Sequence, residues 1–277
     1  MSNFGSGSFT FGSLFRWLGP RRRSVPPAHN RPYPVSIKPR DIAAEPVPAG
    51  GGIDCFDTPG ARATNRARLD HLDGLALDLR GKRLLDVGCG VGHLGEHFRR
   101  LGCRVTCVDG REENIVSLRQ RYPGLEGHVA DVMKEGALTR FGRFDVVLCY
   151  GLLYHLANPL AGLSNLAAVC DDLLLLETCV CDSQEPVFYL VDEPKSANQA
   201  LDCLACRPSP SWVTMALNRV GFPYVYAPAE PPDYPDFHIE WRNDLGHWRD
   251  EHVIRCIFVA SRRPVENPRL VDLLDRG

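Results

Sequence analysis

The chain has 277 residues, of which 44% are hydrophobic and 24% are charged, and its 32 Lys and Arg against 34 Asp and Glu give a formal charge of −2. These values are typical of globular proteins, so they exclude a wholly disordered chain and a strongly basic nucleic-acid-binding protein. No stretch approaches the roughly 18 to 20 uninterrupted apolar residues that a membrane-spanning helix requires.

The first fifty residues differ from the rest of the chain. They contain eight Pro, five Gly, seven basic and two acidic residues, which leaves 25 basic and 32 acidic residues in the remainder. The net charges are therefore +5 and −7. Because proline is too frequent for a helix or a central strand, we expect residues 1–52 to be a disordered basic tail. Weak contact of its aromatic residues and arginines with an anionic membrane surface is an open alternative.

The cysteines bear on the compartment. A secretory signal places positive charge before an apolar stretch, whereas Arg21, Arg22 and Arg23 follow the apolar residues here. We therefore expect a cytoplasmic protein with reduced thiols, and the odd number of 11 cysteines fits poorly with a closed disulfide framework. Four cysteines have a spacing that resembles a zinc site, but its C-x-C half is unusual and we expect no bound metal. They are Cys179, Cys181, Cys203 and Cys206.

Apolar periodicity predicts alternating helices and strands from residue 61 to residue 177. The expected helices are 61–80, 93–101, 112–121 and 160–169, and the expected strands are 83–87, 104–108, 128–130, 144–149 and 173–177. This alternation predicts a parallel sheet that is covered by helices on both faces. The rhythm then breaks, which indicates substrate-side insertions or loops. The remaining segments are an insertion at 178–210, a helix at 211–220, a strand at 224–226, a loop at 227–252, a late strand at 253–260 and a tail or short helix at 263–277.

A glycine-rich segment, LLDVGCGVGHLG at 84–95, lies between the first strand and the next helix. It matches the G-x-G-x-x-G dinucleotide fingerprint, which is a weak signal by itself. Asp86 would repel a pyrophosphate held at this turn and would suit a ligand with an ammonium group. Asp109 ends the second strand, where an acid can accept hydrogen bonds from ribose hydroxyls, and Asp131 follows the third strand, where it can face an adenine. An adenosine that carries an amino acid satisfies all three positions.

Several segments together resemble the class I S-adenosylmethionine-dependent methyltransferases. They are LLDVGCGVGHLG at 84–95, VTCVDG at 105–110, HVADV at 128–132, FDVVLCYGLLYHLANP at 144–159 and LLLLET at 173–178. The resemblance covers about 60–260 and implies a methyltransferase domain at 53–262. It also implies a Rossmann-like, doubly wound α/β fold, with a mostly parallel seven-stranded sheet and an antiparallel late strand. The implied cofactor is S-adenosylmethionine.

The resemblance further implies which residues hold the cofactor. The glycines lie under its methionine part, and Tyr150 and Gly151 line the methyl site. Arg66 pairs with the carboxylate of the cofactor, or alternatively is an exposed arginine on the helix. The expected cofactor-binding residues are Arg66, Asp86, Gly88, Cys89, Gly90, Gly92, Asp109, Gly110, Asp131, Val132, Tyr150 and Gly151.

Tyr154 and His155 follow the fourth strand, at the edge where ligands of α/β sheets lie. The pattern Tyr154-His155-x-x-x-Pro159 is similar to one found in methyltransferases that act on small molecules and on some RNA bases. His155 is the candidate base for a hydroxyl acceptor, because histidine titrates in the useful range. Its alternative role is structural, at the start of a helix.

We therefore expect a methyltransferase that acts on an oxygen or nitrogen of a small molecule. YGLLYHLANP also resembles the corresponding stretch of bacterial enzymes that modify the wobble uridine of tRNA and use a carboxylated relative of S-adenosylmethionine. The charge of −7 after residue 50 weighs against a tRNA acceptor. A non-catalytic cofactor-binding module in an assembly, and an NAD-dependent oxidoreductase, are further alternatives, and Asp86 argues against the latter.

Overall fold

The computed structural model describes residues 52–238, 241 and 254–274. The expected tail therefore lies almost entirely outside the described residues. Residues 239–240 and 242–252 of the expected loop at 227–252 also lie outside them. None of the helices within the described ranges is long and apolar enough to cross a membrane.

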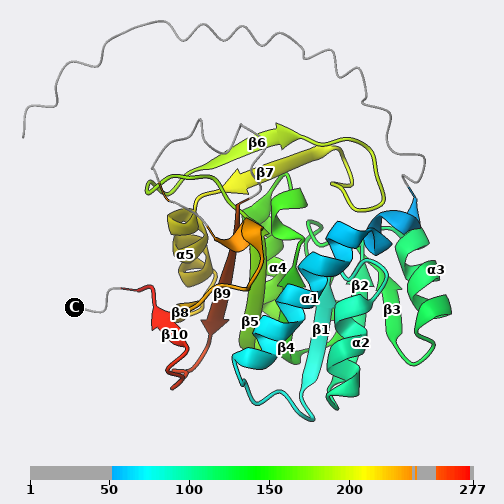
Figure 1. Ribbon diagram of the computed structural model, residues 1–277, viewed down its shortest axis with the longest axis horizontal. Helices are drawn as coiled ribbons and strands as arrows, with labels where there is room; N and C mark the ends of the chain where they lie inside the picture. Colours follow the sequence, from blue (N-terminus) through cyan, green and yellow to red (C-terminus); the bar gives the residue numbers. More distant parts are fainter. Residues whose placement is uncertain (1–51, 239–240, 242–253, 275–277) are drawn as a thin grey trace, which may run out of the picture. The chain divides into compact units, whose positions relative to one another are not determined.

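The described residues form one large mixed sheet with the order β10-β8-β9-β5-β4-β1-β2-β3 (Figure 1). Its strands are β1 (Arg83–Val87), β2 (Arg104–Asp109), β3 (Glu126–Val129), β4 (Phe144–Tyr150), β5 (Cys170–Cys179), β8 (Tyr224–Pro228), β9 (Arg255–Ser261) and β10 (Leu270–Asp272). Neighbours among β1 to β5 pair in parallel, whereas β9 is antiparallel to β5 and β8. The predicted doubly wound fold with a late antiparallel strand is confirmed.

The sheet has eight strands in the described part of the chain, not the expected seven, because β10 adds an edge strand. β10 pairs antiparallel with β8, so that Leu270 lies opposite Pro228 and Asp272 opposite Tyr226. The expected tail or short helix at 263–277 is thus partly a strand, and the sheet extends beyond residue 262. A strand of three residues is too short to show an alternating pattern in the sequence. It is a strand because it pairs with the free edge of β8.

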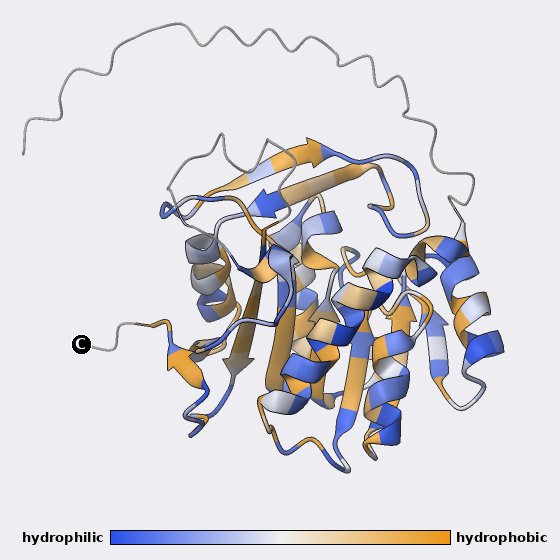
Figure 2. Ribbon diagram, in the orientation of Figure 1, coloured by the Kyte–Doolittle hydropathy of each residue, from blue (hydrophilic) through white to orange (hydrophobic). Residues whose placement is uncertain are grey.

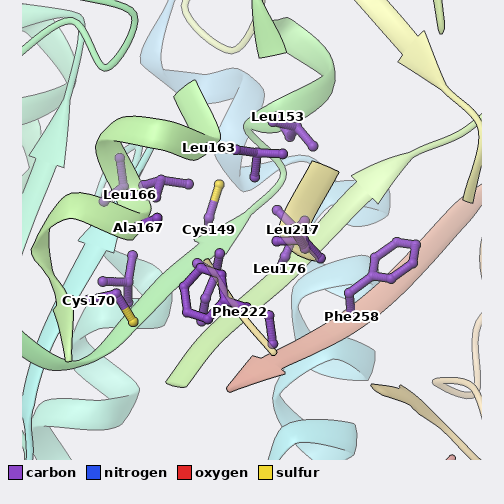
Figure 3. Close-up of a cluster of buried hydrophobic side chains, with 14 of the residues drawn as sticks. Cys149, Leu153, Leu163, Leu166, Ala167, Cys170, Leu176, Leu217, Phe222 and Phe258 are labelled. Carbon is purple, nitrogen blue, oxygen red and sulfur yellow. The ribbon is translucent and has the colours of Figure 1, made fainter. Parts of the chain in front are cut away.

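Helices cover both faces of the sheet. They are α1 (Pro59–Gly74), α2 (His93–Arg100), α3 (Glu112–Arg121), α4 (Pro159–Val169) and α5 (Pro210–Arg219). Side chains of α1 and α2 pack with one set of strand residues, including Val146 and Leu148, and side chains of α4 and α5 pack with the alternate set, including Val147 and Cys149. Figure 2 shows apolar strands between helices whose outer faces are hydrophilic. Figure 3 shows Cys149 among side chains of α4 and α5.

Three of the helices begin with the same local device, a polar N-cap followed by proline. Thr58, Asn158 and Ser209 each accept a hydrogen bond from the backbone amide three residues later. Proline at the first helical position costs no hydrogen bond, because that amide has no partner inside the helix. The sequence specifies these starts locally, and the expected beginning of the helix after Ser209 differs from the observed one by a single residue.

The first helix ends earlier than its apolar spacing predicts. It stops at Gly74, and Ala76 has a left-handed φ of 52° that a helix cannot contain. Leu79 is nevertheless buried, because the chain after the helix still runs against the sheet. The apolar spacing beyond Gly74 therefore reflects burial of these side chains and not a continuation of the helix.

The insertion at 178–210 contains a hairpin that the sequence did not reveal. Strands β6 (Phe188–Asp192) and β7 (Leu204–Pro208) pair antiparallel as a separate two-stranded sheet. Figure 1 shows this hairpin across the end of the main sheet where β1 to β5 terminate. We call residues 193–203, which connect its strands, the hairpin loop.

Candidate functional site

A cavity lies beyond the carboxyl ends of β1, β2, β3 and β4, which is where open α/β sheets bind ligands. Its lining comes from the glycine loop, the turns after these strands, the short helical turn Leu153–His155 and the hairpin loop. The structure brings together eight of the predicted site residues here: Gly88, Gly90, Asp109, Gly110, Asp131, Val132, Gly151 and His155.

The glycine loop lets other groups approach its backbone closely. Gly88 has φ +75° and Gly90 has φ +53°, a conformation that side-chain-bearing residues rarely adopt. A Cβ atom at Gly90 would lie 2.7 Å from Cε1 of Phe56, and one at Gly88 would lie 2.8 Å from Cβ of Leu152. Glycine is therefore required at both positions, and the loop forms a cradle for a ligand.

Asp109 organises the cavity from the end of β2. Its carboxylate accepts hydrogen bonds from the backbone amides of Gly90 and Arg111, each at 2.9 Å, and from Nδ2 of Asn114 at 3.0 Å. Burial raises the pKa of Asp109, although these three donors oppose the shift. Because a carboxylate offers about four lone-pair sites, Asp109 can still accept hydrogen bonds from a ribose.

The cavity wall after β3 is formed by Asp131, the buried Val132 and Met133. The Asp131 carboxylate accepts a hydrogen bond from the backbone amide of Met133 at 3.0 Å, which fixes this turn. The wall thus combines apolar surface with a carboxylate, a combination that suits an adenine ring and its amino group.

Asp86 and Tyr150 lie beneath the cavity and not in its wall. Asp86 is 1% exposed, and burial raises the pKa of its carboxyl to about 7. Tyr150 is also buried, and burial raises the pKa of its phenol. Among the described residues, neither Oδ2 of Asp86 nor the Tyr150 hydroxyl has a hydrogen-bond partner. Asp86 thus supports the loop from below, and its contact with a ligand ammonium stays a prediction.

Cys89 and Gly92 also fall outside the lining. The Cys89 thiol donates to the Gly90 carbonyl at 3.6 Å, and Gly92, with φ 88°, is the N-cap of α2. Both residues shape the turn from the loop into the helix. Their predicted role as cofactor-binding residues stays a prediction.

The expected arginine of α1 is displaced by two residues. Arg66 is exposed and is absent from the cavity wall, whereas Arg68 is buried and contacts the end of β5. Nη2 of Arg68 lies 2.6 Å from Oε2 of Glu177, and 3.2 Å from where a Gly151 Cβ would be. Because residues two apart point to different sides of a helix, only one of the two arginines can face the sheet.

Glu177 is the centre of a buried ion network that the sequence analysis missed. It is fully buried and bonds Arg68 through one oxygen and Nη1 of Arg255, at 2.9 Å, through the other. Nε of Arg255 also lies 3.2 Å from Asp236. Burial alone would raise the pKa of Glu177, but the two arginines hold it below its usual value. The available signal was a charged residue at the end of the apolar run LLLLE.

His155 is held by a residue of the insertion. Its Nδ1 atom lies 2.5 Å from Oε2 of Glu193, and the two side chains are 10% and 5% exposed. Glu193 also bonds Nη2 of Arg207 at 3.3 Å and the backbone amide of Ala200 at 2.9 Å. Burial alone would raise the pKa of Glu193, but these partners, His155 above all, keep it below its usual value. No motif in the insertion pointed to Glu193.

Tyr154 packs beside His155, with 4.0 Å between ring centroids, and does not line the cavity. The guanidinium carbons of Arg207 and Arg255 each lie 5.4 Å from the centre of its ring. Burial raises the pKa of Tyr154 to about 12, so its phenol keeps its proton near neutral pH. Of the two predicted catalytic residues, only His155 lines the cavity.

The four cysteines of the possible zinc site do not form one. In the part of the chain that the structure describes, no three His, Cys, Asp or Glu residues gather as metal ligands. Cys206 instead bonds the Leu153 carbonyl at 3.5 Å. The four cysteines are free thiols, and three of them are buried.

The groups around the cavity suit S-adenosylmethionine. A glycine cradle, a strand-end carboxylate and an apolar wall with Asp131 match its methionine, ribose and adenine parts respectively. The two orphaned polar atoms of Asp86 and Tyr150 lie buried behind the cradle, where a charged amino-acid group would be compensated.

Comparisons with known proteins agree with this geometry. A family model described as a methyltransferase domain matches residues 85–172. Ubiquinone biosynthesis O-methyltransferase of Xanthomonas oryzae pv. oryzae (strain PXO99A) is 39% identical over 104 residues, which cover 36% of this chain and 42% of the relative. The tRNA U34 carboxymethyltransferase of Azotobacter vinelandii is 34% identical over 157 residues, which cover 53% of this chain and 47% of the relative. The chain thus spans about half the length of the curated relatives it matches.

Among solved structures, the N-terminal domain of EvdMO1 with SAH bound is similar, with a TM-score of 0.55 and 24% identity over 72% of this chain and 80% of that one. This likeness shows a shared fold. The matched methyltransferase domain begins in β1 and ends in β5, and so includes the glycine loop, Asp109 and His155. Residues 85–172 therefore form a methyltransferase domain, and the fold and the relatives support a class I S-adenosylmethionine-dependent methyltransferase, whose cofactor is S-adenosylmethionine.

Proposed function

We propose that this protein transfers a methyl group from S-adenosylmethionine to an oxygen or nitrogen of a small molecule. The observation that carries the proposal is the single cavity in which the glycine cradle, the ribose-type carboxylate of Asp109 and the candidate base His155 meet. A cofactor site alone would serve a binding module. The histidine in the same cavity favours an enzyme.

The chain's own residues account for cofactor binding. Gly88 and Gly90 admit the methionine part, Asp109 accepts hydrogen bonds from the ribose, and Asp131 with Val132 flanks the adenine. When bound, S-adenosylmethionine supplies an electrophilic methyl group on its sulfonium sulfur. Methyl transfer then requires the acceptor atom to be held in line, about 3 to 3.5 Å from that carbon.

His155 accepts the proton when the acceptor is a hydroxyl. It lines the cavity, and a histidine base titrates near neutral pH, which is the range in which general bases are efficient. The ring of Tyr154 lies beside both His155 and Arg255. We assign it to positioning of these two side chains and not to proton transfer.

A second cavity offers room for the acceptor. Its volume is about 960 Å³, and Arg255 lies in its wall. Among the described residues that line it, apolar side chains predominate, including Pro228, Pro232, Phe237 and Phe258. Ligand pockets of this size and character hold small, largely apolar molecules. Together with the charge of −7 after residue 50, this favours a small-molecule acceptor.

A tRNA acceptor is the second candidate. The alignment with the tRNA U34 carboxymethyltransferase covers 157 residues, more than the 104 aligned with the ubiquinone O-methyltransferase. An acidic body opposes binding of a polyanion, because phosphate contacts by Lys and Arg supply most of that affinity. The identity of the methylated product separates the two candidates.

The test is to incubate the protein with methyl-labelled S-adenosylmethionine and cell extract, and to identify the labelled product by mass. We expect label in the small-molecule fraction, and we expect His155→Ala to lower the rate by roughly 10² to 10⁴. His128→Ala is the matched control, since His128 bonds Glu126 outside the cavity. Label found only in RNA would contradict the small-molecule acceptor. An undiminished rate in His155→Ala would show that His155 is not the general base.

A further inference from the structure

Glu193 connects two parts of the molecule that are far apart in the sequence. It follows β6 at the start of the hairpin loop, and its carboxylate bonds His155, which follows β4. The same oxygen accepts a hydrogen bond from the backbone amide of Ala200 at the far side of the loop. A single side chain therefore closes the loop on itself and attaches it to the candidate base.

The hairpin loop covers the cofactor cavity. Its residues 197–201 form part of the cavity wall. Nδ2 of Asn114 donates to the Ala197 carbonyl at 3.1 Å, and Nη2 of Arg111 donates to the Gln199 and Ala200 carbonyls at 3.2 and 3.0 Å. Both donors are on or beside α3, directly after Asp109. The loop is thus fastened at the ribose side of the cavity and at His155.

The space under the loop is small. The cavity volume is about 90 Å³, whereas pockets for small ligands and cofactors usually measure roughly 300 to 1,000 Å³. Leu201 fills the region above Gly110, where a Cβ atom would lie 2.6 Å from its Cδ1. A ligand as large as a nucleoside needs more room than this cavity gives, and outward movement of the hairpin loop, which carries Glu193 with it, supplies that room.

We propose that Glu193 is a positioning residue that orients His155 when the hairpin loop closes, so that closure over the cofactor also assembles the base. The inference rests on the proposed function, since it assigns Glu193 a role in the same reaction. With the loop open, His155 loses the carboxylate that fixes its ring. Proton abstraction is thereby confined to the closed state, from which bulk water is excluded.

The chemistry of the pair supports this role. Because the Glu193 carboxylate accepts from Nδ1, that nitrogen carries the proton of the neutral ring, and Nε2 is left to accept one. Among the described residues, none bonds to Nε2. When the acceptor oxygen bonds to the methyl carbon, its proton passes to Nε2 and the carbon–sulfur bonding pair stays on sulfur. The imidazolium that results faces a carboxylate, which stabilises its positive charge.

Two measurements test the pair, and both use S-adenosylhomocysteine as the probe ligand. In ¹⁵N-histidine-labelled protein with this ligand, we expect His155 to carry its proton on Nδ1, with the proton signal shifted downfield by the short contact with Glu193. His155→Ala identifies the signal. Glu193→Gln should move it upfield, and Glu193→Asp, which keeps the charge, should restore part of the shift. Glu185→Gln, an exposed position in the same insertion, should leave it unchanged.

The second measurement is the affinity for S-adenosylhomocysteine by calorimetry. Glu193→Gln and His155→Ala should each weaken it by about 10-fold, the effect of losing a charge-assisted hydrogen bond, and the double variant should be no weaker than either one. Urea unfolding verifies that each variant is folded. Additive effects, or a proton signal unmoved by Glu193→Gln, would overturn the proposal. If the unaltered protein does not bind the ligand, the proposed function fails instead, while the histidine signal in ligand-free protein still tests the contact.

Discussion

Asp86 is a carboxyl buried beneath the glycine loop, where its ionisation is unfavourable. It is buried in β1 with Asp109 nearby, and Oδ2 has no partner among the described residues. Burial raises its pKa to about 7, from an ordinary value of 3.8. The folded protein therefore holds a proton on Asp86 that the unfolded chain releases between about pH 4 and pH 7, so ionisation in this window costs folding stability.

We predict that Asp86→Asn removes this pH dependence. As the pH rises from about 4 to about 7, the free energy of unfolding of the unaltered protein should fall relative to the variant, by on the order of 4 kcal/mol in total. Urea unfolding of both proteins at about pH 4.5 and about pH 7.5 measures the difference. Stability curves that stay parallel across this range would show that Asp86 is ionised at low pH in the fold.

The sequence predicts the site residues that follow regular strands, and it does not predict the one that lies in an irregular insertion. Gly88, Gly90, Asp109 and Asp131 follow parallel strands, and such strand ends necessarily share one edge of the sheet. Their convergence in one cavity could therefore be predicted. Glu193 lies in an irregular insertion, where nothing in the local sequence specifies that the chain folds back over the sheet.

Helix α1 is fastened to the sheet by one buried ion pair. Arg68 bonds Glu177 at the end of β5, whereas Arg66, two residues earlier, is exposed. Removing one partner of a buried pair leaves an uncompensated charge, which is more costly than loss of the attraction alone. Glu177 retains Arg255, so this cost is reduced but not abolished.

We predict that Arg68→Met destabilises the protein by about 3 kcal/mol, whereas Arg66→Met on the same helix changes stability by less than about 0.5 kcal/mol. The pKa of Glu177 is held low, so its stabilisation is present above its ordinary pKa and is lost as the pH falls through the lowered one. The difference between the variants should accordingly shrink in acid. Thermal or urea unfolding checks both statements, and equal stabilities for the two variants at neutral pH would contradict them.

Elements with strong local signals could be predicted, and those defined by distant partners could not. The residue range of α3 follows from its spacing and from the proline after it, and its observed ends agree with the expected ones. The hairpin β6–β7 and the strand β10 are short and exist because other segments pair with them or cover them. In such short segments, intrinsic strand propensity is a weak signal, and tertiary contacts determine the secondary structure.

For the whole molecule, the formal charge of −2 conceals a basic first fifty residues and an acidic remainder. The described part of that remainder unites a class I methyltransferase sheet with a hairpin over its cofactor cavity. Tyr154 lies beside His155, which lines one cavity, and near Arg255, which lines the other. The acidic charge favours an acceptor that is not a polyanion. The family and fold were predictable from spaced motifs, whereas the acceptor was not, because the insertions carry no recognisable motif.

Every functional role proposed for this cavity depends on its binding S-adenosylmethionine, and calorimetry with S-adenosylhomocysteine and with NAD measures that binding. Asp109→Ala, in the cavity, and Asp70→Ala, exposed on α1, serve as a matched pair. We expect saturable binding of S-adenosylhomocysteine and none of NAD, with binding weakened by about 1 to 3 kcal/mol in Asp109→Ala and unchanged in Asp70→Ala. Binding of NAD without binding of S-adenosylhomocysteine would contradict this expectation.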